Sequence, residues 1–448
     1  MRSAFLIAGG LAVLAAAASG EVVVQLKSGR TLRGQVVEQT PHVLRLRTSS
    51  GILVDLKPGE IGDIGSAAGP PPATQPASRA RPATRPAPRG AAHSATCPAD
   101  CPLCERMFRH SLDSYCARVL RRPDAAPIPV RLGAWPALQT PTCCVLGLVL
   151  LGEGEALRPG RHQRTVLKLT RYVNAWADRE HRTLKGHRTW SLAFAVLLLS
   201  ELHRAAPSAS LRRRILRLVR VLESGRQGDQ GWCHTLERGG YGPFVGVTIW
   251  CAAALGAARE QGVAVDEKGL AETFAGLRRS IGPTGGASYY SHHRSSLSVG
   301  RTAGVAWALC RHAGDGKSAA AGRALNFLLR HVEEAPHGHA SGLMSFAWAA
   351  LAASSFGRNE HRAFWRVHRR TLLEARRPGG TFAVQPWRDL GYTDRNDSRP
   401  REAKGTTWPD RMYGEPWATA WMLLAWQAAR GRCLLARCPL GGRIGLEV

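Results

Sequence analysis

Two short stretches of the chain carry tyrosine and histidine side chains that could move protons. They contain Tyr289, Tyr290, His292 and His293, and His337 with His339. Each stretch directly precedes a long apolar segment. A tyrosine or histidine beside the carboxylate of an acidic sugar could remove the neighbouring proton, which is the chemistry of a polysaccharide lyase. Tyr289, His292 and His337 are therefore candidate catalytic residues, set against the simpler interpretation that loop histidines are solvated.

Carboxylates gather in the polar stretch 387–416. Its aspartates are Asp389, Asp394, Asp397 and Asp410. A pair of carboxylates could act as the acid and base of a glycoside hydrolase, which makes Asp394 a fourth catalytic candidate. The same stretch is rich in Asn, Arg and Pro, which favours a polar surface loop, one that could also cover the opening of a cavity.

Cysteines with metal-ligand spacing precede the helical part of the chain. Cys97, Cys101 and Cys104 lie in CPADCPLC, and Cys116 follows. An iron–sulfur cluster would need a reducing compartment and a βα barrel, and the sequence predicts neither. A zinc site with Cys116 as the fourth ligand is the second interpretation. Disulfides near the start of the first helix are favoured for an exported chain, so we predict no metal and no cofactor.

Six long apolar segments must position these side chains. They begin near Thr140, His187, Val245, Val299, His339 and Tyr413, and they are rich in alanine, leucine and tryptophan. A helix that is apolar on every side must be buried on every side. These segments therefore predict inner helices.

Segments with a single apolar face alternate with the apolar ones. In 210–224, Leu211, Ile215, Leu218 and Leu222 recur at helical spacing with arginines between them. Similar patterns occur in 107–120, 166–176, 325–332 and 364–372. Such segments predict outer helices that cover the inner ones. We therefore predict a mainly α fold, an α/α toroid of about six helical hairpins.

Glycine-rich turns with aromatic residues precede three of the apolar segments. They read GDQGW at 228–232, PTGGASYY at 283–290 and RPGGTFAV at 377–384. These turns resemble the Q-x-x-x-G-x-W repeats of squalene cyclases and the related repeats of protein prenyltransferase β subunits. Over 107–430 the chain is similar to this terpenoid-cyclase-like toroid superfamily, and within it to secreted toroid proteins of planctomycete-type bacteria. The resemblance implies that the glycine ends an outer helix and that the aromatic residue fills the gap between successive hairpins.

The chemistry of that superfamily is not implied. Squalene cyclases use an aspartate from a D-x-D-D motif, and the sequence contains no such run. Prenyltransferases hold zinc with Asp, Cys and His, whereas the comparable set of Cys233 and His234 with Asp394 or His337 has no matching spacing. We therefore expect neither reaction.

The N-terminal ends of the inner helices of a toroid meet at one opening, which we call the mouth. Unpaired backbone N–H groups at helix N-termini favour anions. The residues that could bind a ligand there are Arg188, Trp232, His234, Tyr290, His293, Arg301, His339 and Trp417. The competing interpretation is that the aromatic residues pack in the core and the histidines are solvated.

The net charge of +28 has two interpretations. The positive charge could serve to bind an anionic partner such as nucleic acid, acidic polysaccharide or lipid headgroups. Arginine, however, outnumbers lysine by 54 to 7, as a GC-rich genome would produce, and this coding bias is the favoured explanation. The N-terminal β module has no aromatic residue on which bases could stack, so we predict no specific nucleic acid partner.

The remaining sequence predicts an exported protein of several parts. Residues 1–20 are typical of a secretory signal peptide, so we expect export to the periplasm or the extracellular space. Residues 21–65 alternate like about five antiparallel strands and resemble an SH3-like or Sm-like barrel. Residues 66–96 form a Pro/Ala/Arg-rich linker, 97–432 the toroid and 433–448 a tail, without a transmembrane segment in the mature chain.

We expect the toroid to bind a ligand, anionic or polysaccharide, in its central cavity. The first alternative is a polysaccharide lyase or glycoside hydrolase acting at the mouth. The second is a structural scaffold that binds a protein of the cell envelope. Catalysis requires the candidate side chains to share one cavity, binding requires an aromatic cavity rimmed by arginine, and a scaffold requires a filled centre.

Overall fold

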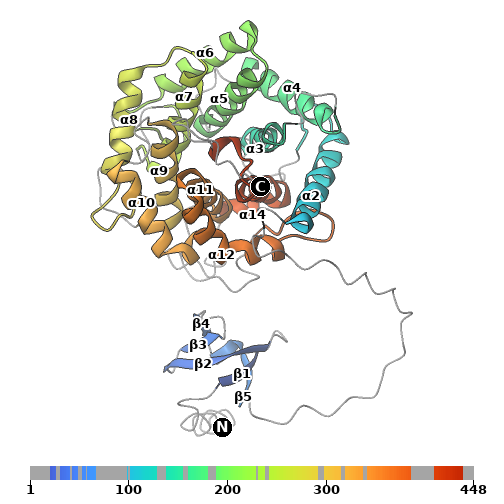
Figure 1. Cartoon of the computed structure of the whole chain (residues 1–448), viewed down its shortest axis with the longest axis vertical. Helices are drawn as coiled ribbons and strands as arrows, with labels where there is room; N and C mark the ends of the chain where they lie inside the picture. Colours follow the sequence, from blue (N-terminus) through green and yellow to red (C-terminus); the bar gives the residue numbers. More distant parts are fainter. Residues whose placement is uncertain are drawn as a thin grey trace, which may run out of the picture. The chain divides into compact units, whose positions relative to one another are not determined.

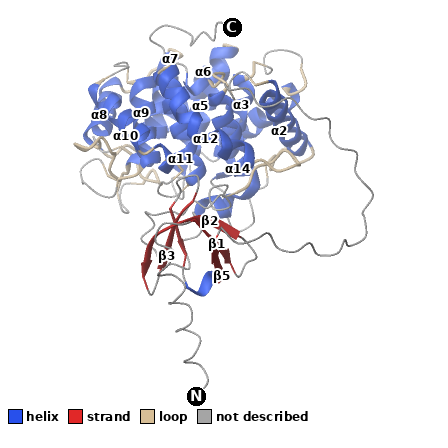
Figure 2. Cartoon of the chain, turned by 60° about the horizontal axis from the view of Figure 1, so that its bottom comes forward, coloured by secondary structure: helices blue, strands red, loops and turns tan. Residues whose placement is uncertain are grey.

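The computed structural model divides the chain into two compact units, 1–90 and 91–448. It describes residues 21–26, 31–40, 43–48, 53–56, 58–66, 98, 101–128, 138–154, 160–179, 188–228, 231–237, 242–290, 297–313, 318–336, 341–384 and 408–436. The predicted signal peptide and almost all of the predicted linker lie outside these residues. Figure 2 shows that the first unit is built from strands and the second from helices.

The first unit is a five-stranded antiparallel sheet with the strand order β4-β3-β2-β1-β5. Its elements are β1 (Glu21–Leu26), β2 (Thr31–Thr40), β3 (Val43–Thr48), β4 (Leu53–Leu56), the short η1 (Pro58–Glu60) and β5 (Ile61–Ser66). Val22 and Val24 on β1 and Leu44 and Leu46 on β3 are buried, because alternate residues of a strand face the same side. The predicted small antiparallel sheet is confirmed.

Six inner helices of the second unit form a closed ring (Figure 1). They are α3 (Gln139–Gly152), α5 (Arg188–Ala205), α7 (Val245–Glu260), α9 (Val299–His312), α11 (Gly342–Phe356) and α14 (Trp408–Ala429). Each packs against the next in chain order, and α14 packs against α3. Within α14 the backbone at Gly414 is non-helical, with φ 70°, so the ring-forming part of α14 begins after this residue.

Six outer helices surround this ring within the described residues (Figure 1). They are α2 (Pro102–Leu120), α4 (Gln163–Arg179), α6 (Ala209–Ser224), α8 (Glu267–Arg279), α10 (Ala319–Arg330) and α12 (Arg358–Glu374). The helix α6 is amphipathic. Its Ile215, Leu218 and Leu222 are buried, whereas Arg213 and Arg220 on the opposite face are exposed. The predicted α/α toroid is confirmed.

Neighbouring inner helices run in the same direction. Near their N-terminal ends, a Cβ on Gly300 of α9 would meet the Ser345 Cβ of α11 at 2.2 Å. At their C-terminal ends, Glu260 of α7 pairs with Arg311 of α9. The N-terminal ends of these inner helices therefore lie on one side of the ring, as predicted for the mouth.

One hydrogen-bonded arrangement recurs three times where a turn leads into an inner helix. The backbone N–H groups of Trp232, Ala287 and Phe382 donate to the hydroxyls of Thr248, Thr302 and Thr419, respectively, at 3.1, 2.7 and 3.2 Å. Each threonine lies in the first turns of an inner helix and donates its own hydroxyl hydrogen to the carbonyl four residues earlier. The turns before them contain glycines with positive φ, such as Gly285 and Gly380, which only glycine adopts readily.

Aromatic side chains pack the centre of the ring. The Trp250 ring lies between 4.6 and 5.7 Å, centroid to centroid, from Phe194, Trp307, Trp348 and Trp421. All five side chains are fully or almost fully buried. At this depth the centre of the ring is therefore packed with side chains.

The toroid extends beyond the predicted boundary at residue 432. The short helix η6 (Leu434–Ala436) contacts α3, α9 and α11. Its Leu435 carbonyl accepts a hydrogen bond from Trp307 Nε1 at 2.7 Å. The start of the predicted tail is therefore part of the core. Among the described residues, no helix combines the length and apolarity needed to cross a membrane.

A partly buried ion pair joins the C-terminal ends of α7 and α9. Arg311 donates two hydrogen bonds to the Glu260 carboxylate, at 2.5 and 2.8 Å, and His312 Nδ1 lies 3.3 Å from the same group. Burial lowers the pKa of His312 to about 4, despite the opposing effect of Glu260. Although burial raises the pKa of Glu260, the hydrogen bonds from His312 and Arg311 lower it to about 2.

The folded protein should lose stability as the pH falls from about 6.5 to about 4. In this window the unfolded chain binds a proton at His312 that the folded protein does not, so protonation favours unfolding. The shift is equivalent to about 3 kcal/mol of unfolding free energy. Urea unfolding at about pH 7 and about pH 4.5 would measure the loss.

His312→Gln should lose about 2 kcal/mol less over this range than the wild-type protein. His331→Gln is the matched control, because the His331 side chain is 42% exposed beside Glu334. His331→Gln should lose as much unfolding free energy over this pH range as the wild-type protein does. Equal losses in the wild-type protein and His312→Gln would contradict the assignment.

Candidate functional site

A continuous row of ring side chains lies at the mouth, near the N-terminal ends of α5 and α7. We call Trp190, His234, Phe244, Tyr289 and Tyr290 the aromatic row. Trp190 Nε1 lies 2.7 Å from His234 Nδ1. His234 lies 4.6 Å from Phe244, Phe244 stacks on Tyr289 at 5.1 Å, and Tyr289 meets Tyr290 edge to face at 4.7 Å. Each ring thus contacts the next.

Backbone hydrogen bonds between successive hairpins hold this row in place. Thr189 N–H donates to the His234 carbonyl at 3.3 Å, and Val245 N–H donates to the Tyr289 carbonyl at 2.9 Å. The first turn of each of these two inner helices is therefore tied to the loop that leads into the next one. Trp190 and Phe244 are buried, whereas His234, Tyr289 and Tyr290 are only partly buried and form the accessible part of the row.

Arg301 places a buried positive charge behind the row. Its guanidinium carbon lies 5.3 Å from the centre of the Tyr289 ring, and its Nε donates to the Ala287 carbonyl at 3.4 Å. The side chain comes from the first turn of α9, where Ser298 caps the helix. Burial lowers the pKa of Arg301 to about 10, so the group remains charged at neutral pH.

The structure brings some of the predicted site residues together at the mouth and places others in the core. His234, Tyr289, Tyr290 and Arg301 lie in or directly behind the aromatic row, and Arg188 is the partly buried first residue of α5. Trp232 is fully buried, and its Nε1 donates to the Leu222 carbonyl at 2.7 Å. This placement argues against the predicted ligand contact, because Trp232 fills the space between α6 and the next inner helix.

Trp417 is likewise buried, and it belongs to a cluster around Asp410. Asp410 accepts hydrogen bonds from Ser341 Oγ at 2.5 Å, from Leu343 N–H at 3.2 Å and from Trp417 Nε1 at 3.1 Å. The carboxylate thereby joins the N-terminal end of α11 to α14. Its negative charge is also stabilised by the partial positive charge at that helix end. Asp410 was predicted to lie in a surface loop, and the structure corrects this. It is a fully buried residue whose hydrogen bonds hold two inner helices together.

Five of the predicted site residues lie outside the described residues. They are His292, His293, His337, His339 and Asp394. Their roles as candidate acid, base or ligand-binding groups stay predictions.

The cysteines predicted to form disulfides or a zinc site lie along α2, from Cys101 just before the helix to Cys116 near its C-terminal end. Cys101, Cys104 and Cys116 are buried, whereas Cys97 lies outside the described part of the chain. Within the described part, no group of three or more His, Cys, Asp or Glu side chains could hold a metal ion. The choice between disulfides and a zinc site that includes Cys97 therefore stays a prediction.

Two members of the aromatic row were not predicted as site residues. Trp190 and Phe244 occur at the start of apolar segments, where they look like ordinary core residues. The repeated Gly-turn pattern offers one signal, since Phe244 lies four residues before Thr248 and hydrogen-bonds to it. No local pattern marks Trp190 as a neighbour of His234.

Comparison with known proteins identifies the family but no activity. No curated protein matches the chain. Among solved structures, the chain is similar to the cellobiose 2-epimerase from Spirochaeta thermophila DSM 6192, with 13% sequence identity and a TM-score of 0.44, over 65% of this chain and 85% of that chain. A family model described as "Domain of unknown function (DUF6288)" matches residues 140–416. Because this match covers more than half of the chain, the protein belongs to the DUF6288 family.

Proposed function

We propose that this protein binds an acidic oligosaccharide at the mouth of the toroid, without cyclase or prenyltransferase chemistry. The observation that supports the proposal is the aromatic row. Sugar rings present flat C–H faces that stack on aromatic rings, and their hydroxyls suit the polar tips of Tyr and His. The partly buried Tyr289, Tyr290 and His234 offer both kinds of contact within one connected surface.

An acidic sugar fits the electrostatics of this surface. Arg301 carries its charge 5.3 Å behind the Tyr289 ring. The N-terminal ends of the inner helices contribute partial positive charges on the same side of the ring. A carboxylate on the sugar would be attracted by both, whereas a cationic ligand would be repelled.

Binding is favoured over catalysis by the groups that the structure describes. Tyr289 stacks on Phe244 with an interplanar angle of 4° and lies near a buried arginine. Asp410, the described aspartate of the polar stretch 387–416, already accepts three hydrogen bonds that join helices. A catalytic carboxylate would need room for its substrate, and Asp410 has none.

Calorimetric titration with hexasaccharides would test the proposal. The probes are oligogalacturonate as the acidic glycan and cellohexaose as its neutral counterpart. We expect the acidic glycan to bind more tightly than the neutral one. Tyr289→Ala should weaken its binding about tenfold, because one stacked aromatic ring contributes about 1.4 kcal/mol to the binding free energy. Tyr172→Ala, a partly buried tyrosine on the outer helix α4, is the matched control and should leave the affinity unchanged.

Two outcomes would count against the proposal. One is a failure of both hexasaccharides to bind at millimolar concentration. The other is equal affinity of the wild-type protein and Tyr289→Ala for the acidic probe, provided that the variant keeps the wild-type circular dichroism spectrum. Tighter binding of cellohexaose would support a glycan site at the aromatic row but contradict the proposal that its ligand is acidic.

A further inference from the structure

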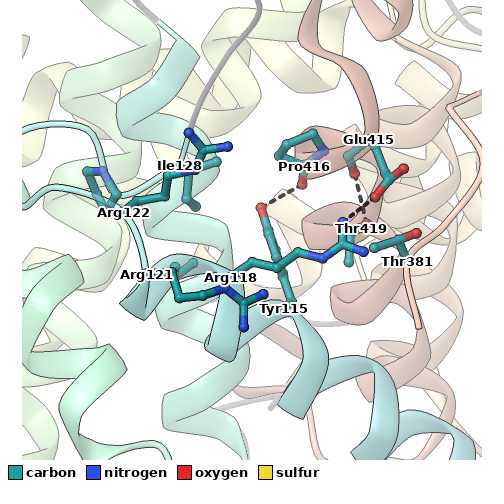
Figure 3. Close-up of a pocket in the computed structure, with 11 residues that line it drawn as sticks. Tyr115, Arg118, Arg121, Arg122, Ile128, Thr381, Glu415, Pro416 and Thr419 are labelled. Atoms are coloured by element: carbon teal, nitrogen blue, oxygen red, sulfur yellow. Dashed lines mark hydrogen bonds and ion pairs between the residues drawn. The ribbon is translucent and has the colours of Figure 1, made fainter. Parts of the chain in front are cut away.

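A cavity of about 340 Å³ lies where the last helical hairpin of the ring meets the first (Figure 3). It opens between the C-terminal end of α2 and the segment of α14 just after Gly414. Tyr115, Val119, Arg121, Arg122 and Ile128 line it from α2 and the segment that follows, and Pro416 lines it from α14. Its volume falls within the range of small-molecule sites, which begins at about 300 Å³.

Apolar and hydrogen-bonded groups form the inner wall of this cavity. Val119 and Ile128 are buried apolar residues that line the cavity. Ile128 and Pro416 of α14 lie on opposite sides of it (Figure 3). Tyr115 donates its hydroxyl hydrogen to the Pro416 carbonyl at 2.7 Å and so closes the floor. Burial raises the pKa of Tyr115, so this hydroxyl stays protonated. The side chains of this inner wall are uncharged.

The rim, in contrast, is strongly basic. Three of the lining side chains are the arginines Arg118, Arg121 and Arg122, and one is the carboxylate Glu415. Arg118 pairs with Glu415 at 2.5 Å. Arg121 and Arg122 are exposed, and neither forms an ion pair with another described residue. Two of the arginines that line the cavity therefore form no ion pair with a carboxylate of the described residues.

Arginines at a helix C-terminus are often explained by the helix dipole alone. That role needs no cavity beside the charges. Lys168 also serves it here, because its Nζ donates hydrogen bonds to the carbonyls of Leu120 and Arg122 and pairs with Asp124 at 3.2 Å. With this end of α2 already capped by a lysine, the positions of Arg121 and Arg122 around an apolar cavity call for another explanation.

We infer that this cavity is a binding site for a small organic carboxylate with a flat apolar body. The body would pack against Val119, Ile128 and Pro416, and the carboxylate would lie between Arg121 and Arg122. Guanidinium groups bind carboxylates through paired, charge-assisted hydrogen bonds, which a neutral head group cannot reproduce. The site is separate from the aromatic row and does not depend on the proposed function.

Three probes separate the two halves of this inference. 2-Naphthoate carries both the apolar body and the carboxylate, 2-naphthamide carries only the body, and acetate carries only the charge. Titration of the full chain followed by NMR or calorimetry should give 2-naphthoate a dissociation constant of about 1 mM or lower, as expected for a ligand of this size. Both other probes should bind at least about tenfold more weakly.

The double variant Arg121→Gln/Arg122→Gln should weaken 2-naphthoate binding by about tenfold or more. Both side chains are exposed, so the fold should be unaffected. Arg213→Gln/Arg220→Gln on the exposed face of α6 is the matched control with the same change of charge. Tyr289→Ala should also leave 2-naphthoate binding unchanged, which separates a failure here from a failure of the proposed glycan site.

The inference is overturned if 2-naphthamide or acetate binds as tightly as 2-naphthoate. It is also overturned if the double variant at Arg121 and Arg122 binds 2-naphthoate as well as the wild-type protein does. An equal loss of binding in the α6 control variant would show that net charge alone attracts the anion, which likewise rejects a site at the cavity.

Discussion

Trp250→Ala should lower the free energy of unfolding by about 3–5 kcal/mol, the range for removing a large aromatic side chain from a packed core. Trp250 is fully buried, and its ring contacts four other aromatic rings contributed by α5, α9, α11 and α14. Its Nε1 also points at Met344 Sδ, 3.3 Å away. Because its neighbours come from four helices of a closed ring, they cannot move inwards together to fill the space.

Urea unfolding followed by circular dichroism would measure this loss. Leu297→Ala is the control, since Leu297 is a large apolar residue with 38% exposure and its truncation should cost less than about 1 kcal/mol. Indole should raise the melting temperature of Trp250→Ala more than that of the wild-type protein, because it fits the new cavity. A cost below about 1 kcal/mol for Trp250→Ala would mean that the centre of the ring is not tightly packed.

The packed centre changes where a ligand could bind. The sequence predicted a central cavity, because aromatic residues on inner helices can either line a cavity or fill it. Periodicity shows that a side chain faces inwards, but it carries no information about how far opposite side chains reach. Trp250 contacts both Trp348 and Trp421, so at this depth the side chains fill the centre of the ring instead of lining a cavity.

Most of the helical architecture could be predicted because it depends on local patterns. The inner helices are apolar on all sides, and five of the outer helices show clear spacing of apolar residues. The outer helix α8 was not predicted. Its buried residues Leu270, Phe274 and Leu277 have helical spacing, but two glycines and few large apolar residues weaken the pattern. The cap at Asp266, which accepts from Gly269 N–H at 3.0 Å, was the available signal.

The candidate site was less predictable than the fold because it is assembled from distant segments. Tyr289 and His234 could be selected as residues with suitable chemistry. Their connection through Trp190 and Phe244 depends on how one hairpin is placed against the next, and no sequence spacing encodes that. The cavity beside α2 was missed for the same reason, since Arg122 and Glu415 are about 300 residues apart in the chain.

A second large effect is expected where α14 closes the ring against α3. The Arg430 side chain is 1% exposed and Glu153 is fully buried. Arg430 donates to Glu153 at 2.9 Å and pairs with Glu105 at 2.5 Å. Its guanidinium also lies 4.1 Å from the centre of the Phe108 ring on α2. Although burial raises the pKa of Glu105, the neighbouring arginines lower it overall, so this carboxylate is ionised at neutral pH.

Arg430→Ala should therefore cost about 3–5 kcal/mol of unfolding free energy, because it leaves the Glu153 carboxylate buried with weaker partners. Gln427 Nε2, at 3.0 Å, and Arg109, at 3.4 Å, remain beside Glu153 but do not replace the lost contact. Arg432→Ala is the matched control. Arg432 lies 3.7 Å from both Glu105 and Glu153, but its side chain is 51% exposed, and the loss should stay below about 1 kcal/mol.

A double-mutant cycle separates the ion pair from simple loss of packing. If the pair carries the effect, Glu153→Ala/Arg430→Ala should be more stable than the sum of the two single losses predicts, by about 1–3 kcal/mol. Once Arg430 is absent, removing Glu153 takes away a buried charge that no longer has its main partner. Strict additivity would instead assign the loss to the packing of Arg430 on Phe108 and not to the ion pair with Glu153.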